Sequence, residues 1–123
     1  MDEVVTGSPR DVADAYLAAL SRHDFGALEQ VVAADYRHHS NGVDFDFPGL
    51  RARTSWLIGG LPDLRVTPGS FVCEDDAVAV RWLAEGTHHG SLNGERPTGH
   101  PVRFPGITMF HVADTRVVED WQM

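Results

Sequence analysis

The sequence predicts an α+β fold, with helices in the first half of the chain and an antiparallel sheet in the second. Two observations support this prediction. Apolar residues recur at helical spacing as far as residue 61, and stretches rich in β-forming residues follow from residue 64. Helices followed by a meander of strands indicate a curved sheet covered by about three helices on one face. Such a sheet encloses a cavity, which is a usual place for a ligand.

The three helices are predicted from their caps and their apolar spacing. Ser8, which is followed by a proline, begins the first helix, and this helix is expected to end near Ser21–His23. Asp24 is placed to cap a short second helix. The third helix is expected over Leu50–Leu61, where a glycine pair and a following proline end it.

The strands are predicted from the alternation of apolar and polar side chains. The clearest case is Ala77–Thr87, where Val78, Val80 and Trp82 alternate with Arg81 and Glu85. Proline cannot donate to a ladder, so a bulge is expected at Pro105-Gly106. The other expected strands are 64–73, 102–112 and 117–123, and a short extended stretch at 36–39 is followed by a loop at 44–49.

The length and the charge of the chain exclude several classes of protein. The 123 residues correspond to one domain, which begins near Ser8, and no repeat or linker divides positions 1–123. The net charge of −8 would repel a phosphate backbone, which argues against a nucleic-acid partner. No apolar run reaches the ~18–20 residues of a membrane span. The acidic N-terminus lacks a secretory signal pattern and a single cysteine permits no internal disulfide, so we expect a cytoplasmic protein.

Five short segments stand out along the chain: PDLRV at 62–66, VAVRW at 78–82, GTH at 86–88, PTG at 97–99 and VVEDW at 117–121. They resemble segments of the SnoaL-like polyketide cyclases (ester cyclases) of the NTF2-like superfamily. Together with weaker matches they occur in the family's order along nearly the whole chain. The resemblance implies a cone-shaped α+β barrel, a homo-oligomer (homodimer or homotetramer) and no cofactor.

The resemblance also implies a reaction. The family's cyclases close the last ring of an aromatic polyketide ester by an intramolecular aldol reaction, which makes the expected partner a small hydrophobic, polycyclic aromatic substrate. They use an aspartate acid/base late in the chain, and Asp120 is the residue that matches it. Three alternatives stay open on the same scaffold: a hydroxylation component, a hydrolase, and a non-catalytic small-molecule-binding domain.

The orientation of Asp120 decides its role. Strand alternation places Val118, Asp120 and Gln122 on one face, and Val117, Glu119 and Trp121 on the other. A carboxylate that faces an apolar cavity loses hydration, which makes it a stronger general base. A bulge near the preceding turn would exchange the two faces, so Glu119 stays open as the alternative.

The seven histidines offer further candidates. We expect His88 and His39 to line the cavity and to donate to a substrate carbonyl, with His88 as a catalytic residue that helps to stabilise an enolate oxygen. The alternative is a metal site built from His39, His88 and Glu85. The sequence has no HExxH motif and no Cys/His cluster, so we expect no metal.

Several aromatic side chains are candidates for the flat walls of a substrate site, and their alternative role is core packing. Arg51, Arg53 and Arg103 either bind a substrate carboxylate or supply ordinary surface charge. The aromatic candidates for substrate binding are Tyr16, Trp56, Trp82 and Phe104.

Overall fold

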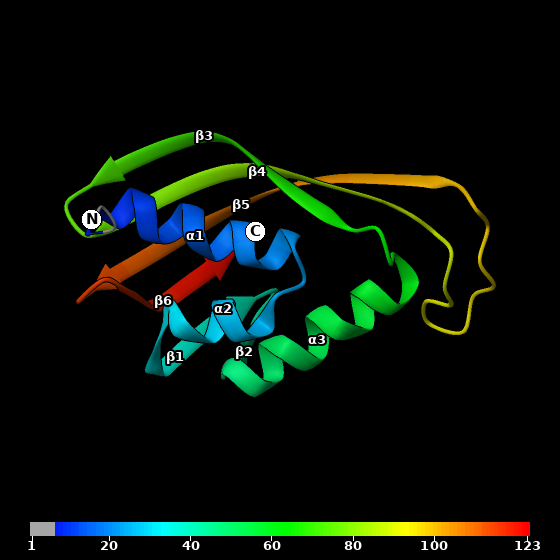
Figure 1. Ribbon diagram of the computed structural model, residues 1–123, viewed down its shortest axis with the longest axis horizontal. Helices are drawn as coiled ribbons and strands as arrows, with labels where there is room; N and C mark the ends of the chain where they lie inside the picture. The colour runs from blue at the N-terminus through cyan, green and yellow to red at the C-terminus, as the bar shows by residue number, and fades with distance from the viewer. Residues whose placement is uncertain (1–6) are drawn as a thin grey trace.

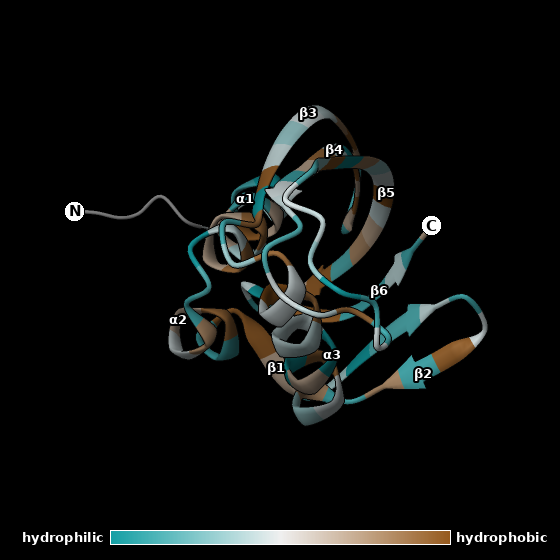
Figure 2. Ribbon diagram, turned by 90° about the vertical axis from the view of Figure 1, so that its right-hand side faces the viewer, coloured by the Kyte–Doolittle hydropathy of each residue, from teal (hydrophilic) through white to brown (hydrophobic). Residues whose placement is uncertain are grey.

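Six strands form one curved sheet, and three helices lie in its hollow (Figures 1 and 2). The computed structural model describes residues 7–123, so the first six residues, on which the expectation of no secretory signal partly rests, lie outside the described residues. The elements are α1 (Pro9–Ser21), α2 (Phe25–Gln30), β1 (Val32–Ser40), β2 (Val43–Phe45), α3 (Phe47–Gly60), β3 (Arg65–Glu74), β4 (Ala77–Thr87), β5 (Pro101–Ala113) and β6 (Arg116–Gln122). The predicted α+β class is confirmed.

The strand order across the sheet is β2-β1-β6-β5-β4-β3. Neighbouring strands run antiparallel except β1 and β6, which pair in parallel and bring the first strand of the chain beside the last. Figure 2 shows the sheet curling from β3 around to β1 and β2, with the helices on its concave side. This is the cone-shaped arrangement that the resemblance implies, and its one parallel pair was not expected from the meander.

Each helix begins at a side-chain cap. Ser8 Oγ accepts the backbone N–H of Asp11 at 3.0 Å, and Asp24 caps α2 in the same way, as predicted. Asp46 caps α3 by accepting the N–H of Gly49 at 2.9 Å, so this helix starts at Phe47, before the expected Leu50. The stretch expected to be a loop at 44–49 therefore contains the end of β2 and the first turn of α3.

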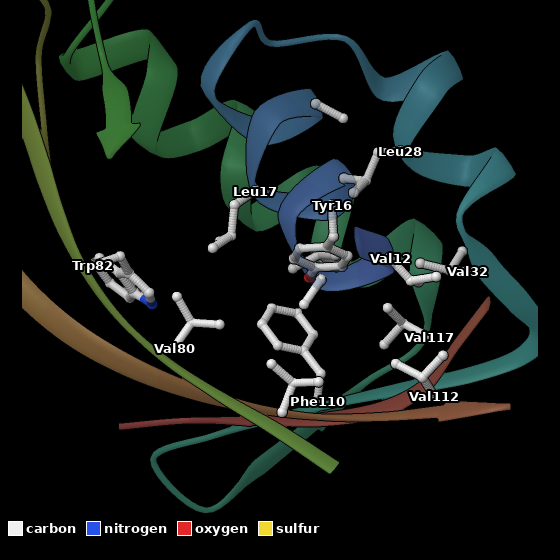
Figure 3. Packing of buried hydrophobic residues seen from close by; sticks show 14 of the residues in the cluster. Val12, Tyr16, Leu17, Leu28, Val32, Val80, Trp82, Phe110, Val112 and Val117 are labelled. Carbon is white, nitrogen blue, oxygen red and sulfur yellow. The ribbon is translucent and has the colours of Figure 1, made fainter. Parts of the chain in front are cut away.

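The core lies between α1 and the concave face of the sheet. Figure 3 shows Tyr16 and Leu17 of α1 above Val80 and Phe110 of the sheet. The rings of Tyr16 and Phe110 meet edge to face with centroids 5.0 Å apart. Among the helices of the described chain, none is long and apolar enough to cross a membrane.

Pro105 does not produce the bulge expected at Pro105-Gly106. The register between β4 and β5 continues through this point, where Pro105 pairs with Leu83. The other neighbour of β5, β6, meets it only from Ile107 onward, through backbone bonds between Ile107 and Met123. Since β5 has a free edge at Pro105, the missing N–H breaks no ladder on that side.

Gly106 provides a first prediction. A Cβ at this position would lie 2.2 Å from Cζ2 of the Trp82 ring, which packs directly over the glycine. We expect Gly106→Ala to lower the free energy of unfolding by about 1–3 kcal/mol, because a close-packed core resists an added methyl group. Urea denaturation of the purified variant measures this change.

The matched control is Gly59→Ala in α3. A Cβ there meets no atom within 4 Å, and alanine favours a helix over glycine, so stability should stay equal or rise by roughly 0.5–1 kcal/mol. Equal stability of Gly106→Ala and the unsubstituted protein would contradict the packing argument.

Candidate functional site

A cavity of about 240 Å³ lies between α1, α3 and the concave face of the sheet. The four aromatic residues expected to bind substrate, Tyr16, Trp56, Trp82 and Phe104, all contribute to its lining. Trp82 is held in place because its Nε1–H donates to Thr108 Oγ1 at 2.9 Å. Trp56 is 49% exposed and stands at the mouth. The cavity is slightly smaller than the ~300–1,000 Å³ common for ligand sites, so a molecule with several fused rings would extend through the mouth.

Asp120 is fully buried beside this cavity, and both of its carboxylate oxygens are hydrogen-bonded. Tyr36 OH donates to Oδ2 at 2.6 Å, and His38 Nδ1 lies 2.5 Å from Oδ1. The hydroxyl of Tyr16 lies 2.7 Å from that of Tyr36 and extends the chain of contacts. We call Tyr16, Tyr36, His38 and Asp120 the Asp120 network. It compensates for the loss of water around a buried charge.

A bulge in β6 turns Asp120 inward. Val117 pairs with Val112 of β5 and Glu119 pairs with His111, so Val118 is an extra residue between them. As a result both Val117 and Asp120 are buried, whereas strict alternation predicted opposite faces. On the other side of β6, His38 of β1 lies directly opposite Asp120 in the parallel register. Glu119 is left on the outer face.

The hydroxyl groups of the network stay protonated. Burial raises the pKa of Tyr16 well above its usual value, and the charge of Asp120 raises it further. Burial likewise raises the pKa of Tyr36, with the neighbouring Tyr16 and Asp120 adding to the effect. Tyr36 therefore donates a hydrogen bond to Asp120, and Tyr16 donates one to the Tyr36 oxygen.

Arg53 determines which nitrogen of His38 carries the proton. Arg53 Nη1 lies 3.2 Å from His38 Nε2, and a guanidinium group only donates hydrogen bonds. Nε2 is therefore the acceptor. The ring proton is on Nδ1, and this N–H donates a hydrogen bond to Asp120. His38 and Arg53 line the cavity, whereas Asp120 lies behind His38 and is not part of the lining. The basic lone pair nearest the cavity is that of His38 Nε2.

The comparisons with known proteins agree with this fold. The model of the SnoaL-like polyketide cyclase family matches residues 10–123. The chain belongs to this family. No curated protein matches it by sequence.

Solved structures share the fold over nearly the whole chain. IdmH of Streptomyces antibioticus, described as a proposed polyketide cyclase, is 28% identical, with a TM-score of 0.88 over 94% of this chain and 91% of its own. AclR of Streptomyces galilaeus, described as a proposed hydroxylase, is 24% identical, with a TM-score of 0.87 over 97% of this chain and 90% of its own. A proposed SnoaL-like cyclase from Jannaschia is 19% identical, with a TM-score of 0.84 over 100% of this chain and 90% of its own.

His39 does not line the cavity as expected. Tyr36 and His38 face inward along β1, and alternation therefore places His39 on the outer face. Its two ring nitrogens contact Asp44 at 2.6 Å and Glu119 at 2.5 Å, and its ring stacks on Trp121. The inward alternation from the buried Tyr36 is the signal that could have selected His38 from the sequence.

His88 also lies away from the cavity lining. It follows the last residue of β4 and packs within the loop that leads to β5, where Nδ1 lies 3.1 Å from Thr98 Oγ1. The ladder between β4 and β5 ends at the pair of Thr87 and Pro101, so His88 lies beyond the strand and does not line the cavity as expected. Within residues 7–123, no group of three His, Cys, Asp or Glu side chains is arranged to hold a metal, so His39, His88 and Glu85 form no such group.

The three candidate arginines differ in whether they reach the cavity. Arg53 of α3 lines the cavity, as just described, and sequence alone had left it open as surface charge. Arg51 is exposed and stacks over the Phe25 ring at 5.1 Å from the centroid. Arg103 is exposed and lies 3.5 Å from Glu85.

The outer contacts of His39 lead to a prediction about pH. Hydrogen bonds to Asp44 and then to Glu119 raise the pKa of His39 above its usual value. A raised pKa means that the folded state binds the proton more tightly than the unfolded chain. The resulting stabilisation is fully present below the unfolded value of ~6.5, while the two carboxylates remain ionised, and is lost as the pH rises through the folded value.

We therefore expect His39→Gln to reduce the free energy of unfolding more at about pH 6 than at about pH 9. Urea denaturation at both pH values measures the two differences. His111→Gln, which removes an exposed imidazole from the outer face of β5, is the control. An equal loss at both pH values for His39→Gln would show that the ion pairs of His39 do not stabilise the fold.

Proposed function

We propose that this protein is a cofactor-independent cyclase that closes a carbocyclic ring of an aromatic polyketide ester by an intramolecular aldol reaction. Membership of the SnoaL-like family and the likeness to IdmH support a cyclase. The observation that carries the proposal is the buried pair of Asp120 and His38, which directs the lone pair of Nε2 toward a cavity with aromatic walls.

The reaction needs one group that takes a proton and returns it. In the proposed sequence, His38 Nε2 removes a proton from a substrate carbon flanked by two carbonyl groups, and the electron pair of that C–H bond forms an enolate. The enolate carbon then forms a C–C bond to the carbon of a further carbonyl group in the same molecule. The C=O π bond breaks, and the resulting alkoxide takes the proton back from His38. Substrate and product have the same composition.

Asp120 acts through His38 in this proposal rather than on the substrate. The sequence predicted a direct acid/base role, but Asp120 lies behind the imidazole ring. Its carboxylate keeps the Nδ1 proton in place and stabilises the imidazolium that forms when Nε2 takes up a proton. Asp120 is thus a positioning residue, and His38 is the catalytic acid/base.

The aromatic walls of the cavity supply the remaining contribution to catalysis. Trp82 and Phe104 meet edge to face with ring centroids 6.3 Å apart, and together with Tyr16 they restrict how a planar molecule can lie. Holding both reacting carbons close converts a slow encounter into an intramolecular step, which can contribute several kcal/mol. The family resemblance further supports a homodimer or homotetramer.

The experiment that tests the function is mass spectrometry of the purified protein incubated with anthraquinone-type polyketide esters, without added cofactor. A product of unchanged mass and new retention time is expected, since aldol closure is an isomerisation. A gain of one oxygen would instead indicate hydroxylation, the activity proposed for the structurally similar AclR. A gain of one water would indicate hydrolysis. Either gain, or no product with any such ester, would contradict the proposed cyclase.

Substitution of either His38 or Asp120 is expected to lower turnover without unfolding the protein. His38→Gln should lower kcat by at least ~10²-fold, the usual scale for loss of a general base. Asp120→Asn should lower kcat by a similar factor with little change in KM, because its amide can donate to Nδ1 and so place the ring proton on Nε2. Steady-state kinetics measures both effects, and circular dichroism checks the fold.

Glu119→Gln is the matched control for Asp120→Asn. Glu119 is the adjacent acid on the same strand, but it lies on the outer face and contacts His39. Turnover should stay close to that of the unsubstituted protein, because Glu119 contacts none of the reacting groups. A folded Asp120→Asn variant with ordinary kcat would rule out the positioning role.

A further inference from the structure

Arg53 is a half-buried cation in the cavity, and no carboxylate of the described chain forms a direct ion pair with it. Among residues 7–123, no Asp or Glu oxygen lies within 4 Å of its guanidinium nitrogens. Its contacts are instead His38 Nε2, at 3.2 Å, and the face of the Phe45 ring, at 5.4 Å from the centroid. An imidazole nitrogen and an aromatic ring hold the guanidinium in place, and the nearest carboxylate on this path, Asp120, lies on the far side of the imidazole ring, so the guanidinium has no direct ion pair.

The contact between Arg53 and His38 blocks the nitrogen that acts as the general base. The lone pair of Nε2 can accept one proton donor, and in the described structure the donor is Arg53 Nη1. A substrate C–H bond can reach Nε2 only after the guanidinium moves away. Moving it without a new acceptor would sacrifice a charge-assisted hydrogen bond, so a productive substrate must supply that acceptor.

We propose that Arg53 is the oxyanion-binding residue of this cavity, and this proposal rests on the proposed function. When substrate binds, the guanidinium transfers from Nε2 to the carbonyl oxygen next to the reacting carbon. The same movement uncovers the base and places a positive charge where the enolate oxygen develops. The C–H carbon and that oxygen are two bonds apart in any enolisable carbonyl compound, so neighbouring groups on the protein can serve both.

The distribution of charge in the molecule supports Arg53 as the residue that binds the oxyanion. The chain carries a net charge of −8, which disfavours an anion at long range. Among the cavity-lining residues of the described chain, Arg53 is the one with a permanent charge. Hydrogen bonds from a cation to an oxyanion are stronger in a site shielded from water. The predicted ligand class is therefore a planar, conjugated carbonyl compound that binds more tightly as its enolate or phenolate than as a neutral molecule.

Two dyes test this preference without any turnover. 2-Hydroxyanthraquinone ionises to a coloured phenolate, whereas 2-methoxyanthraquinone has nearly the same shape and cannot ionise. Absorbance titration with the purified full chain gives the affinity of each dye and the pH at which the bound hydroxy dye ionises. The variants are Arg53→Gln, Arg53→Lys as a charged alternative, and Arg51→Gln as a control that removes the same charge from the exposed side of α3.

We expect the unsubstituted protein and Arg51→Gln to bind the phenolate more tightly than the methoxy dye, and to lower the pH at which the bound dye ionises. Arg53→Gln should weaken phenolate binding by about 10- to 100-fold, the size of a charge-assisted hydrogen bond, while methoxy-dye binding stays within about two-fold. Arg53→Lys should retain part of the preference.

Two results would overturn the inference, and they are distinguishable. If both dyes bind and Arg53→Gln does not change the preference for the phenolate, Arg53 does not bind the oxyanion, although the cavity still accepts planar aromatic molecules. If neither dye binds to the folded, unsubstituted protein, the polycyclic substrate class itself is wrong, and the proposed function fails together with the role of Arg53.

Discussion

The buried carboxylate of Asp120 is the constraint on which the arrangement of the site depends. A charged group with no solvent exposure is costly by several kcal/mol unless hydrogen bonds replace its water. Tyr36 and His38 provide those bonds from β1, and Tyr16 supports Tyr36 from α1. One acidic residue on the last strand therefore links the first helix and the first strand. The same requirement orients His38, because the ring must turn Nδ1 toward Asp120.

Local pattern predicted the elements well where caps and alternation were strong. The bounds of β4 were predicted correctly because Val78, Val80 and Trp82 share one face of a β-forming stretch that lies between clear turns. The start of α3 was missed because its cap, Asp46, lies inside a stretch that looked like a loop. The inward face of Asp120 was left open for a physical reason. The bulge at Val118 exists only through pairing with β5, which strand alternation alone does not contain.

The candidate site was less predictable than the fold because its contacts join distant parts of the chain. His38 meets Asp120 through the parallel pairing of β1 and β6, and nothing local signals that pairing. Sequence reasoning selected His39, which its outward position on β1 excludes from the cavity. The role of Arg53 was left open between substrate binding and surface charge, since an arginine on a helix usually faces water. Only the approach of α3 to β1 shows that its guanidinium reaches His38.

The contact between Arg53 and His38 also bears on selectivity. If the guanidinium occupies the base until an acceptor oxygen draws it away, an apolar molecule that enters the cavity meets a blocked lone pair. An enolisable carbonyl compound, by contrast, exchanges one acceptor for another, so uncovering the base requires little free energy. Affinity for flat, apolar molecules then comes from Trp82, Phe104 and Tyr16, whereas proton removal depends on a correctly placed oxygen. Binding and catalysis would thus be selective for different features of the same substrate.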